Sequence, residues 1–401
     1  MTHSAPRTHG LDTLRSVAIL SVIFFHVNIF RHDASIPALL APAARLGWAG
    51  VDLFFVLSGY LIGTQILRPY LVGECPGLWA FYRKRLFRVL PAYAAVLLLY
   101  CFVPIWSEDP GHLPPLWQLV TFTQNLFVDY RVDHAFSHVW SLCVEEHFYL
   151  LLPLIVLAMM RKPSVRKTTA LLATLVLFGI CLRAFFLFHL LKPLANAGQP
   201  FGLAYIERIY YPTYSRLDGL LAGVALALVK TFRPAWWSML ARRGNALCCL
   251  GIALVGTALY LFKDRWESVS GASALGVVLG FPLLSAGLGL LVASALCTNG
   301  LLRFKVPGAK LIATLAYSLY LTHKEVIHLV DLCFPVSLRT GVLQWLGLYA
   351  CSCLVVAAAL YLCVERPFLI LRDKRKTSKQ ATHGPSFSDG LEQKARSSMK
   401  L

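Results

Sequence analysis

Charged residues are scarce in this sequence. Asp, Glu, Lys and Arg together make up 14% of its 401 residues, whereas hydrophobic residues make up 57%. A soluble domain of this length does not need so much apolar material. Long apolar runs, among them 11–30, 51–67 and 283–296, reach or approach the length of a bilayer span. We therefore predict an all-α fold: a polytopic membrane protein built as a bundle of about ten transmembrane helices.

Acidic residues are scarcer than basic ones, with 20 Asp and Glu against 38 Lys and Arg, so the formal net charge is +18. The basic residues lie in every second loop between the apolar runs, whereas the alternate loops are poorer in them and hold acidic residues. This is the positive-inside pattern of membrane proteins. It predicts no nucleic-acid partner and a multi-pass protein of the bacterial inner membrane, with both termini in the cytoplasm.

Metal-ligand spacing and an internal repeat are also lacking. The eleven Cys residues are scattered, mostly inside apolar runs, and none has metal-ligand spacing with a His, so we expect no metal site. No small-residue cleavage site follows the first apolar run, so we expect no cleavable signal peptide. We find no repeat relating the two halves, which argues against a secondary transporter of a small anionic or sugar substrate, kept here as the alternative function.

The apolar runs divide the chain into a membrane domain, residues 1–371, and a basic disordered cytoplasmic tail, residues 372–401. Within the longest outer loop, 116–127 is apolar but too short to span, so we expect a re-entrant or interfacial segment. The ten predicted spans are 11–30, 46–67, 86–106, 138–160, 168–191, 212–229, 244–262, 271–297, 309–330 and 342–371. Small residues in the second span favour close approach of a neighbouring helix: Gly50, Ser58, Gly59 and Gly63.

Arg15 and His26 lie eleven residues apart in the first span. Eleven residues at about 100° each bring a helix back to within roughly 20° of its start, so the two side chains share one face, about 16 Å apart along the axis. Ionisable groups are expensive in hydrocarbon, so such a pair indicates function. When the ionisable residues are sorted by their depth in the predicted spans, the cytoplasmic side holds cations: Arg15, Arg85 and Arg88. The outer half offers His and carboxylates together with two arginines: His26, Asp52, Glu145, Glu146, Arg183, Arg216, Asp218 and His323.

This division of polar groups predicts a site for two substrates. An anionic donor would bind from the cytoplasm, with its phosphates on Arg85 and Arg88, which share a helix face at a spacing of three. A neutral acceptor would enter from outside and meet His26, a general base suited to activating a hydroxyl. Glu145 or Asp52 would hold the imidazole tautomer and stabilise the imidazolium.

Structural explanations stay open for several of these residues. Arg85 and Arg88 also fit anchors at the cytoplasmic end of a helix. Arg216 and Asp218 also fit an ion pair that holds helices together. His323 also fits a hydrogen-bonded core histidine. A non-catalytic membrane scaffold is a third class of function, and it predicts that removing the histidine of the first span changes no chemistry.

Seven segments extend in order from residue 10 to residue 367. They are GLDTLRSVAIL (10–20) followed by His26, GWAGVDLFFVLSGYLI (47–62), RLFR (85–88) followed by Pro91, WSLCVEE (140–146), SRLDGLLAG (215–223), YSLYLTH (317–323) and ERP (365–367). Each segment alone is weak, but in this order they are specific. Together they resemble the acyltransferase-3 family of integral membrane acyltransferases.

The resemblance implies a domain of ten helices that passes an acyl group, usually acetyl, from cytoplasmic acyl-CoA to a hydroxyl of an extracytoplasmic glycan or other cell-envelope acceptor. Acyl-CoA would be a donor substrate, and no cofactor would stay bound. The family's basic residue and catalytic histidine correspond to Arg15 and His26, its paired arginines to Arg85 and Arg88, and its acidic residue after Trp-Ser to Glu145. Four further residues would line the acceptor side or brace the helices: Asp52, Arg216, Asp218 and His323.

The sequence departs from the family pattern at a few positions. Thr13 stands where the family usually has Gly, and His147 where it usually has Gln. Lys324 and Glu325 follow His323 where less charged residues are common. Many relatives carry an esterase-like domain after the last span, and we expect this chain to act without one. The predicted partners are acyl-CoA, a hydroxyl-bearing acceptor such as a glycan or glycolipid, and the lipid bilayer.

Overall fold

The structure is a computed structural model that describes residues 9–30, 40–107, 112–133, 135–263, 265, 268–334 and 341–373. These residues form helices and connecting turns, with no strand among them. The prediction of an all-α fold is confirmed. Most of the predicted C-terminal tail, from residue 374 onward, lies outside the described residues.

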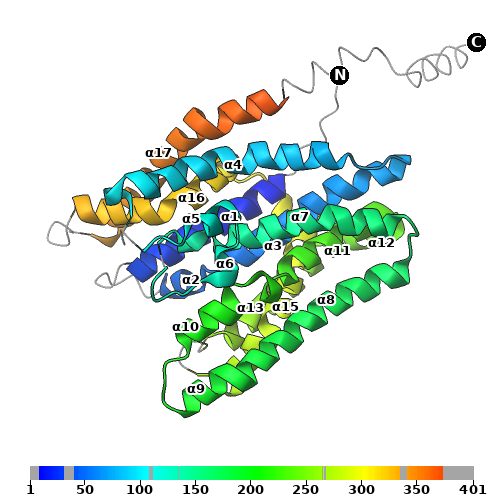
Figure 1. Ribbon diagram of the computed structural model, residues 1–401. Helices are drawn as coiled ribbons and strands as arrows, with labels where there is room; N and C mark the ends of the chain where they lie inside the picture. The colour runs from blue at the N-terminus through cyan, green and yellow to red at the C-terminus, as the bar shows by residue number, and fades with distance from the viewer. Residues whose placement is uncertain are drawn as a thin grey trace, which may run out of the picture.

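Long helices pack side by side in one bundle (Figure 1). The α-helices are α1 (His9–Phe30), α2 (Ala41–Leu46), α3 (Ala49–Leu67), α4 (Leu78–Phe102), α5 (Leu116–Val120), α6 (Gln124–Phe127), α7 (Trp140–Met160), α8 (Val165–Phe186), α9 (Lys192–Asn196), α10 (Gly202–Tyr205), α11 (Asp218–Phe232), α12 (Pro234–Ala241), α13 (Gly244–Leu261), α14 (Gly271–Leu275), α15 (Phe281–Leu296), α16 (Ala309–Cys333) and α17 (Val342–Leu360). Single π-helical turns occupy Leu187–Leu191, Ile206–Tyr210, Gly276–Gly280 and Tyr361–Glu365.

Eight helical segments of the described chain are long and apolar enough to cross a membrane, which supports a multi-pass membrane protein. They are His9–Ile29, Ala49–Val72, Leu78–Phe102, Ser137–Met160, Val165–Asn196, Gly244–Leu261, Gly271–Leu296 and Gln344–Asp373. The predicted count of ten is not confirmed. The two other predicted spans correspond to α11, which has 15 residues, and to α16, which has 25 residues and carries four charged side chains: Lys310, Lys324, Glu325 and Asp331.

The outer segment predicted to be re-entrant or interfacial, 116–127, contains the two short helices α5 and α6. Gln118 and Leu119 of α5 are buried. The Tyr93 hydroxyl of α4 donates a 2.9 Å hydrogen bond to the Leu119 carbonyl oxygen. This segment therefore packs against the bundle and does not cross it.

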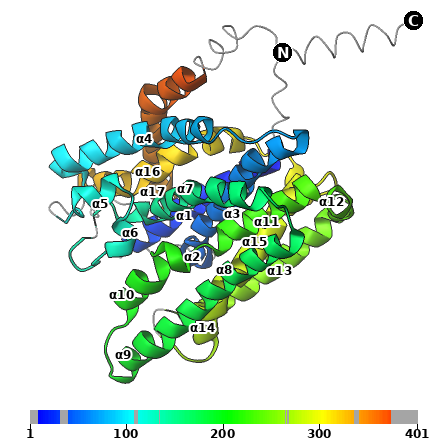
Figure 2. The same ribbon diagram turned by 45° about the vertical axis from the view of Figure 1, so that its right-hand side comes forward.

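The centre of the bundle is made by α1, α3, α11 and α16. Helix α1 packs against both α3 and α16, and α3 packs against α11. A second view keeps α1 and α3 in the middle, with α4 above them and α8 below (Figure 2). The Ser16 hydroxyl of α1 donates a 2.7 Å hydrogen bond to the Ala309 carbonyl at the start of α16, which joins the two helices at that end.

Glycines let α3 and α11 approach until their backbones touch. A Cβ added to Gly59 would lie 2.1 Å from the Leu220 carbonyl oxygen, and one added to Gly223 would lie 2.2 Å from the Val56 carbonyl oxygen. Small residues at a helix interface are the usual way to gain packing contacts inside a membrane. The predicted close approach at Gly59 is confirmed.

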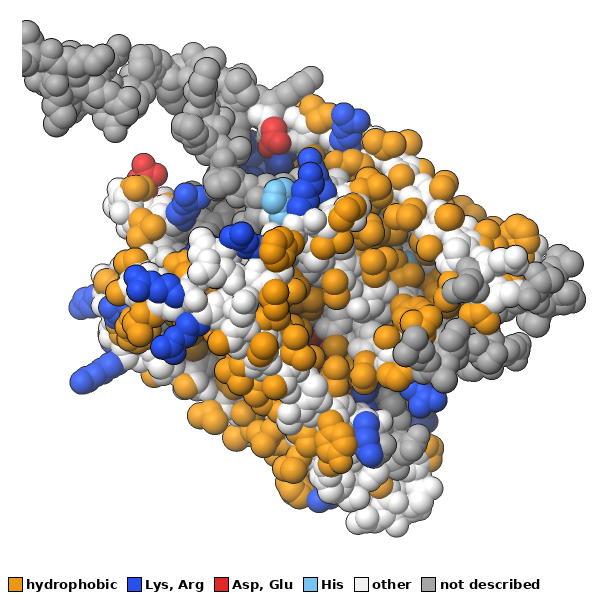
Figure 3. Space-filling view, turned by 180° about the vertical axis from the view of Figure 1, so that it is seen from behind, with side chains coloured by type: hydrophobic (Ala, Val, Ile, Leu, Met, Phe, Trp, Pro, Cys, Tyr) orange, Lys and Arg blue, Asp and Glu red, His pale blue; other side chains and the backbone are white. Residues whose placement is uncertain are grey.

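The outer surface of the bundle is largely apolar. Figure 3 shows hydrophobic side chains over the broad middle of one face, with Lys and Arg gathered mostly toward its edges. Large exposed apolar side chains include Phe102, Phe178, Ile252 and Val355. Helices satisfy their own backbone hydrogen bonds, so an apolar exterior of this kind suits contact with lipid chains.

We predict that Gly223→Ala destabilises the protein, because the added methyl group would clash with the α3 backbone. The backbone can move away only if α3 and α11 separate. Overpacking of this kind costs about 1–3 kcal/mol. Thermal unfolding of the purified protein in detergent measures the loss. Gly256 of α13 is the matched control, since a Cβ there meets nothing within 4 Å. Gly256→Ala should leave stability unchanged or raise it slightly through helix propensity. Equal melting temperatures for the two variants would contradict the close crossing.

Candidate functional site

A cavity of about 590 Å³ opens between α1, α3, α4, α7 and α16. Four of the residues singled out in the sequence line it together: Arg15, Arg85, Arg88 and Glu145. Lys84 and Arg372 add two further cations to its wall, and Asp373 adds a carboxylate. The positions come from four separate segments of the chain, so the cavity depends on the way the bundle packs.

The Arg88 guanidinium is held at the cavity wall by an ion pair. Its Nη1 atom lies 2.6 Å from Oε1 of Glu365, whose side chain is buried in the last π-helical turn. The other oxygen of Glu365 accepts a 2.8 Å hydrogen bond from the Ser318 hydroxyl of α16. Arg88 keeps 35% of its side chain exposed, so the guanidinium still presents surface to the cavity while its position is fixed.

The other two arginines are also oriented by neighbours. The Arg85 guanidinium lies over the ring of Tyr149, 3.9 Å from its centroid. Arg15 lies 3.6 Å from Asp12, one turn earlier on α1. Guanidinium groups bind phosphate oxygens through pairs of parallel N–H donors, so three such groups around one cavity are suited to an anionic molecule.

Glu145 lies on the wall formed by α7, where two hydroxyl groups hold its carboxylate. Ser58 of α3 donates a 2.8 Å hydrogen bond to Oε1, and Tyr149 of α7 donates another of 2.8 Å to Oε2. A carboxylate in an apolar bundle requires such donors. These two bonds fix the direction in which Glu145 faces the cavity.

His26 is not among the residues that line this cavity. Its Nδ1 atom lies 2.9 Å from the Val22 carbonyl oxygen, one turn back on α1. The Nε2 atom of His323, from α16, lies 3.2 Å from the same Nδ1 atom. The Nδ1 atom of His323 in turn lies 2.9 Å from the Tyr320 carbonyl oxygen and 3.1 Å from that of Leu319. The structure thus brings the two histidines named from the sequence into direct contact.

Tyr320 lies between the cavity and His323, and Ser141 is its hydrogen-bond neighbour. Both line the cavity, and their hydroxyl oxygens are 2.6 Å apart. The Tyr320 ring centroid lies 5.9 Å from that of His323, whose ring lies 4.8 Å from that of His26. Tyr320 therefore connects the arginine-lined space with His323, which in turn contacts His26.

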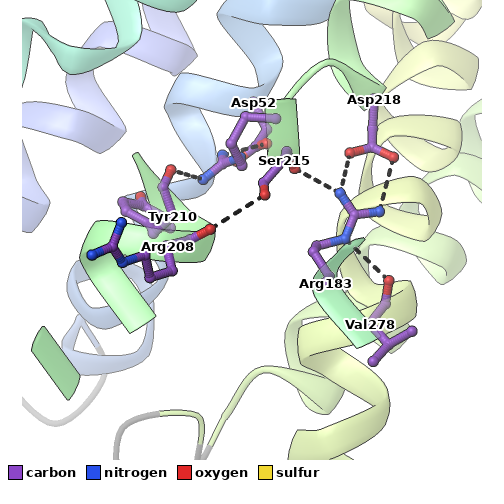
Figure 4. Close-up of polar contacts among 8 residues, drawn as sticks. Asp52, Arg183, Arg208, Tyr210, Ser215, Asp218 and Val278 are labelled. Atoms are coloured by element: carbon purple, nitrogen blue, oxygen red, sulfur yellow. Dashed lines mark hydrogen bonds and ion pairs between the residues drawn. The ribbon is translucent and has the colours of Figure 1, made fainter. Parts of the chain in front are cut away.

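Two buried ion pairs occupy the start of α11, outside the cavity lining (Figure 4). Arg183 of α8 contacts both carboxylate oxygens of Asp218, at 2.8 and 3.2 Å. Arg216 binds Asp52 of α3 at 2.8 Å and donates a 3.0 Å hydrogen bond to the Tyr210 carbonyl. Arg216 and Asp218, considered above as an ion pair with each other, are instead each paired with a residue of another helix.

Sequence reasoning missed Glu365, Ser141, Tyr320 and His138 as contributors to the site. His138 is buried, and its ring centroid lies 5.4 Å from that of His323. The first three lie inside recognised segments, but nothing local distinguishes them from packing residues. Arg88 and Glu365 are 277 positions apart, so their pairing has no signal in the chain. Among the described residues, no group of three or more His, Cys, Asp or Glu side chains is arranged to hold a metal ion.

The chemistry available is anion binding beside an acid–base group. The arginines can hold phosphates at one end of the cavity, and Ser141 and Tyr320 mark the end nearest the histidines. The Nδ1 proton of His26 is directed at the Val22 carbonyl, so the lone pair of the neutral ring belongs to Nε2. This atom can accept a proton or attack an electrophile.

Comparison with known proteins gives a consistent family match. The family described as "Acyltransferase domain" matches residues 8–364. The chain is 26% identical over 353 residues to O-acetyltransferase OatA of Staphylococcus aureus (strain NCTC 8325 / PS 47), covering 80% of this chain and 51% of that protein. It is 31% identical over 232 residues to putative peptidoglycan O-acetyltransferase YrhL of Bacillus subtilis (strain 168), covering 55% of this chain and 33% of that protein.

Peptidoglycan O-acetyltransferase OatA of Listeria monocytogenes serovar 1/2a is 28% identical over 236 residues, with 56% of this chain and 34% of that protein covered. The chain thus matches about half or less of the length of these curated relatives. No solved structure matches the chain.

We predict that Asp218→Asn strongly destabilises the bundle, because it leaves the fully buried Arg183 charge without its carboxylate. Breaking a buried ion pair costs about 3–5 kcal/mol. Thermal unfolding in detergent is the measurement. Asp373→Asn is the control, since Asp373 pairs with Arg372 while 58% exposed, and exposed pairs contribute little. If both variants unfold at the same temperature as the parent protein, the ion pair of Arg183 does not hold the helices together.

Proposed function

The chain belongs to the acyltransferase-3 family, and from this premise we propose that it is a membrane O-acyltransferase. In this proposal an acyl group, acetyl in the first instance, moves from acyl-CoA to a hydroxyl of an extracytoplasmic glycan of the cell envelope. The observation that carries the proposal is the arginine-lined cavity whose wall includes Tyr320, a direct neighbour of the His26–His323 pair.

The donor end of the site is the arginine-lined part of the cavity. Arg85 and Arg88 face it from adjacent turns of α4, and Arg15 faces it from α1. We propose that these guanidinium groups bind the phosphates of CoA, since the ion pair of Arg88 and the ring contact of Arg85 hold them in place before the donor arrives. Preorganised donors lose less side-chain entropy on binding.

The distribution of charge supports a proposal for the side from which each substrate enters. The cavity wall carries Lys84 beside Arg85, and Arg372 at the end of the last span. Loops rich in Lys and Arg mark the cytoplasmic side of a membrane protein. We propose that CoA enters from the cytoplasm, that both termini lie there, and that the acceptor approaches the histidines from the opposite side.

His26 carries the proton transfer in this mechanism. As the acceptor oxygen attacks the thioester carbonyl, a C–O bond forms and the C–S bond breaks, while the hydroxyl proton passes to Nε2 of His26 and then to the departing CoA thiolate. Direct attack of Nε2 on the thioester would use the same atom. We propose that either route moves the Tyr320 side chain, because it lines the cavity and lies against His323.

Glu145 completes the wall beside the donor. Its carboxylate is oriented by Ser58 and Tyr149. We propose that it polarises groups of the bound substrates within the cavity, whereas the ion-paired Asp52, Arg216 and Asp218 brace the helices. The names of two relatives point to peptidoglycan as the first acceptor to try.

The test uses purified protein in nanodiscs, acetyl-CoA labelled in the acetyl group, and soluble peptidoglycan fragments as the trial acceptor. His26→Ala should lower acetyl transfer by roughly 10²- to 10⁴-fold, the usual contribution of a general base, with an unchanged Kd for acetyl-CoA. Arg85→Ala should weaken acetyl-CoA binding by about 10-fold or more, because it removes charged hydrogen bonds to phosphate. Transfer is followed by counting label in the glycan, and binding by calorimetry.

Arg68→Ala is the matched control for Arg85→Ala, because Arg68 is exposed and does not line the cavity. It should leave both measurements unchanged. A folded His26→Ala protein that transfers acetyl at the parent rate would exclude the proposed mechanism. Equal acetyl-CoA affinities for Arg85→Ala, Arg68→Ala and the parent would exclude the proposed donor site.

A further inference from the structure

His26 and His323 meet inside the bundle, and their hydrogen bonds define the proton positions of both rings. A carbonyl oxygen only accepts, so the 2.9 Å contact of His26 Nδ1 with the Val22 carbonyl requires a proton on Nδ1. The same reasoning places a proton on Nδ1 of His323, which lies 2.9 Å from the Tyr320 carbonyl. Both rings are therefore protonated at Nδ1.

The contact between the two rings then has one direction. Nε2 of His323 lies 3.2 Å from the protonated Nδ1 of His26, so it must offer a lone pair, which makes the His323 ring neutral. The Nδ1 proton of His26 is shared between the Val22 carbonyl and the His323 nitrogen. The result is a directional chain that runs from His26 through His323 to the carbonyls of α16.

Packing prevents His323 from leaving this orientation. The residue is fully buried. Its ring has edge-on contacts with His26 and His138, and Tyr320 lies against it at 5.9 Å between centroids. Rotation of the ring would break the bonds to the Leu319 and Tyr320 carbonyls in a region without exposed surface. His323 is therefore a fixed acceptor for the Nδ1 proton of His26.

We propose that His323 is a positioning residue for His26: it holds the Nδ1–H tautomer, directs Nε2 toward the substrates and accepts charge from the imidazolium that forms during transfer. This inference rests on the proposed function, in which Nε2 of His26 takes the proton. A neutral imidazole acts here where catalytic triads use a carboxylate. The residue does not itself contact the donor or the acceptor.

The experiment compares His323→Ala with His323→Gln in nanodiscs, with labelled acetyl-CoA and peptidoglycan fragments as probes. The Gln side chain can place an amide oxygen near the position of Nε2 and accept from His26, whereas Ala cannot. His323→Ala should lower kcat about 10- to 100-fold, less than the loss of the base itself, with KM for acetyl-CoA unchanged. His323→Gln should recover at least a third of the decrease in log kcat that His323→Ala causes.

His328→Ala is the matched control, because this partly buried histidine lies on the same helix five residues later. It should leave kcat unchanged. The double variant His26→Ala/His323→Ala should be no slower than His26→Ala alone, because residues that act as one unit are not additive.

Three results overturn the inference while leaving the proposed function in place. They are parent activity in His323→Ala, equal losses in the Ala and Gln variants when both remain folded, and a further loss in the double variant. If His323→Ala does not fold, the Gln variant decides: a kcat within about threefold of the parent supports the inference, and a larger loss opposes it. Parent activity in His26→Ala is a different outcome, since it removes the proposed function itself.

Discussion

Charge that is buried in an apolar bundle must be neutralised inside it, and the start of α11 is where this protein meets that requirement. Arg183 from α8 pairs with Asp218, and Arg216 pairs with Asp52 from α3. An unpaired charge at this depth would cost more than most packing contacts supply. The two pairs therefore fix α3, α8 and α11 relative to one another, and Arg183 extends this link to the Val278 carbonyl ahead of α15.

The shape of the cavity depends on this arrangement of the helices. Helix α3 is fixed to α11 by the Asp52 ion pair at one end and by the backbone contact at Gly59 farther along. Between them lies Ser58, which holds the Glu145 carboxylate of α7 at the cavity wall. The contact of Gly50 with the Ala18 backbone places α1 against the opposite face of α3 from the one that meets α11. The residues that brace the bundle and the residues that face the cavity thus belong to one continuous set of contacts.

The sequence was sufficient for the helices and for which side chains are polar at which depth, because hydrophobic runs and helical spacing are local properties. On that basis Arg15, Arg85 and Arg88 are expected together on one side of the membrane, and all three line the cavity. Glu145 is expected in the outer half with His26, yet it lines the same cavity as the arginines. The partners were not predictable, because each depends on packing between distant helices. Glu365 neutralises Arg88 from the far end of the chain, and nothing in the ERP segment indicates it. That His26 does not line the cavity was equally unpredictable from the sequence.

The choice of a histidine to orient His26 follows from the surroundings. A carboxylate at the position of His323 would bring a full negative charge into a fully buried place, and it would then need its own cation or several donors. Glu145 and Glu365 show that requirement, since Glu145 accepts from two hydroxyl groups and Glu365 accepts from one hydroxyl and forms an ion pair with Arg88. A neutral imidazole accepts the Nδ1 proton without adding net charge, and its own proton is satisfied by carbonyls of the same helix. In an apolar bundle this is the less costly way to fix a tautomer and to share the charge of a transient imidazolium.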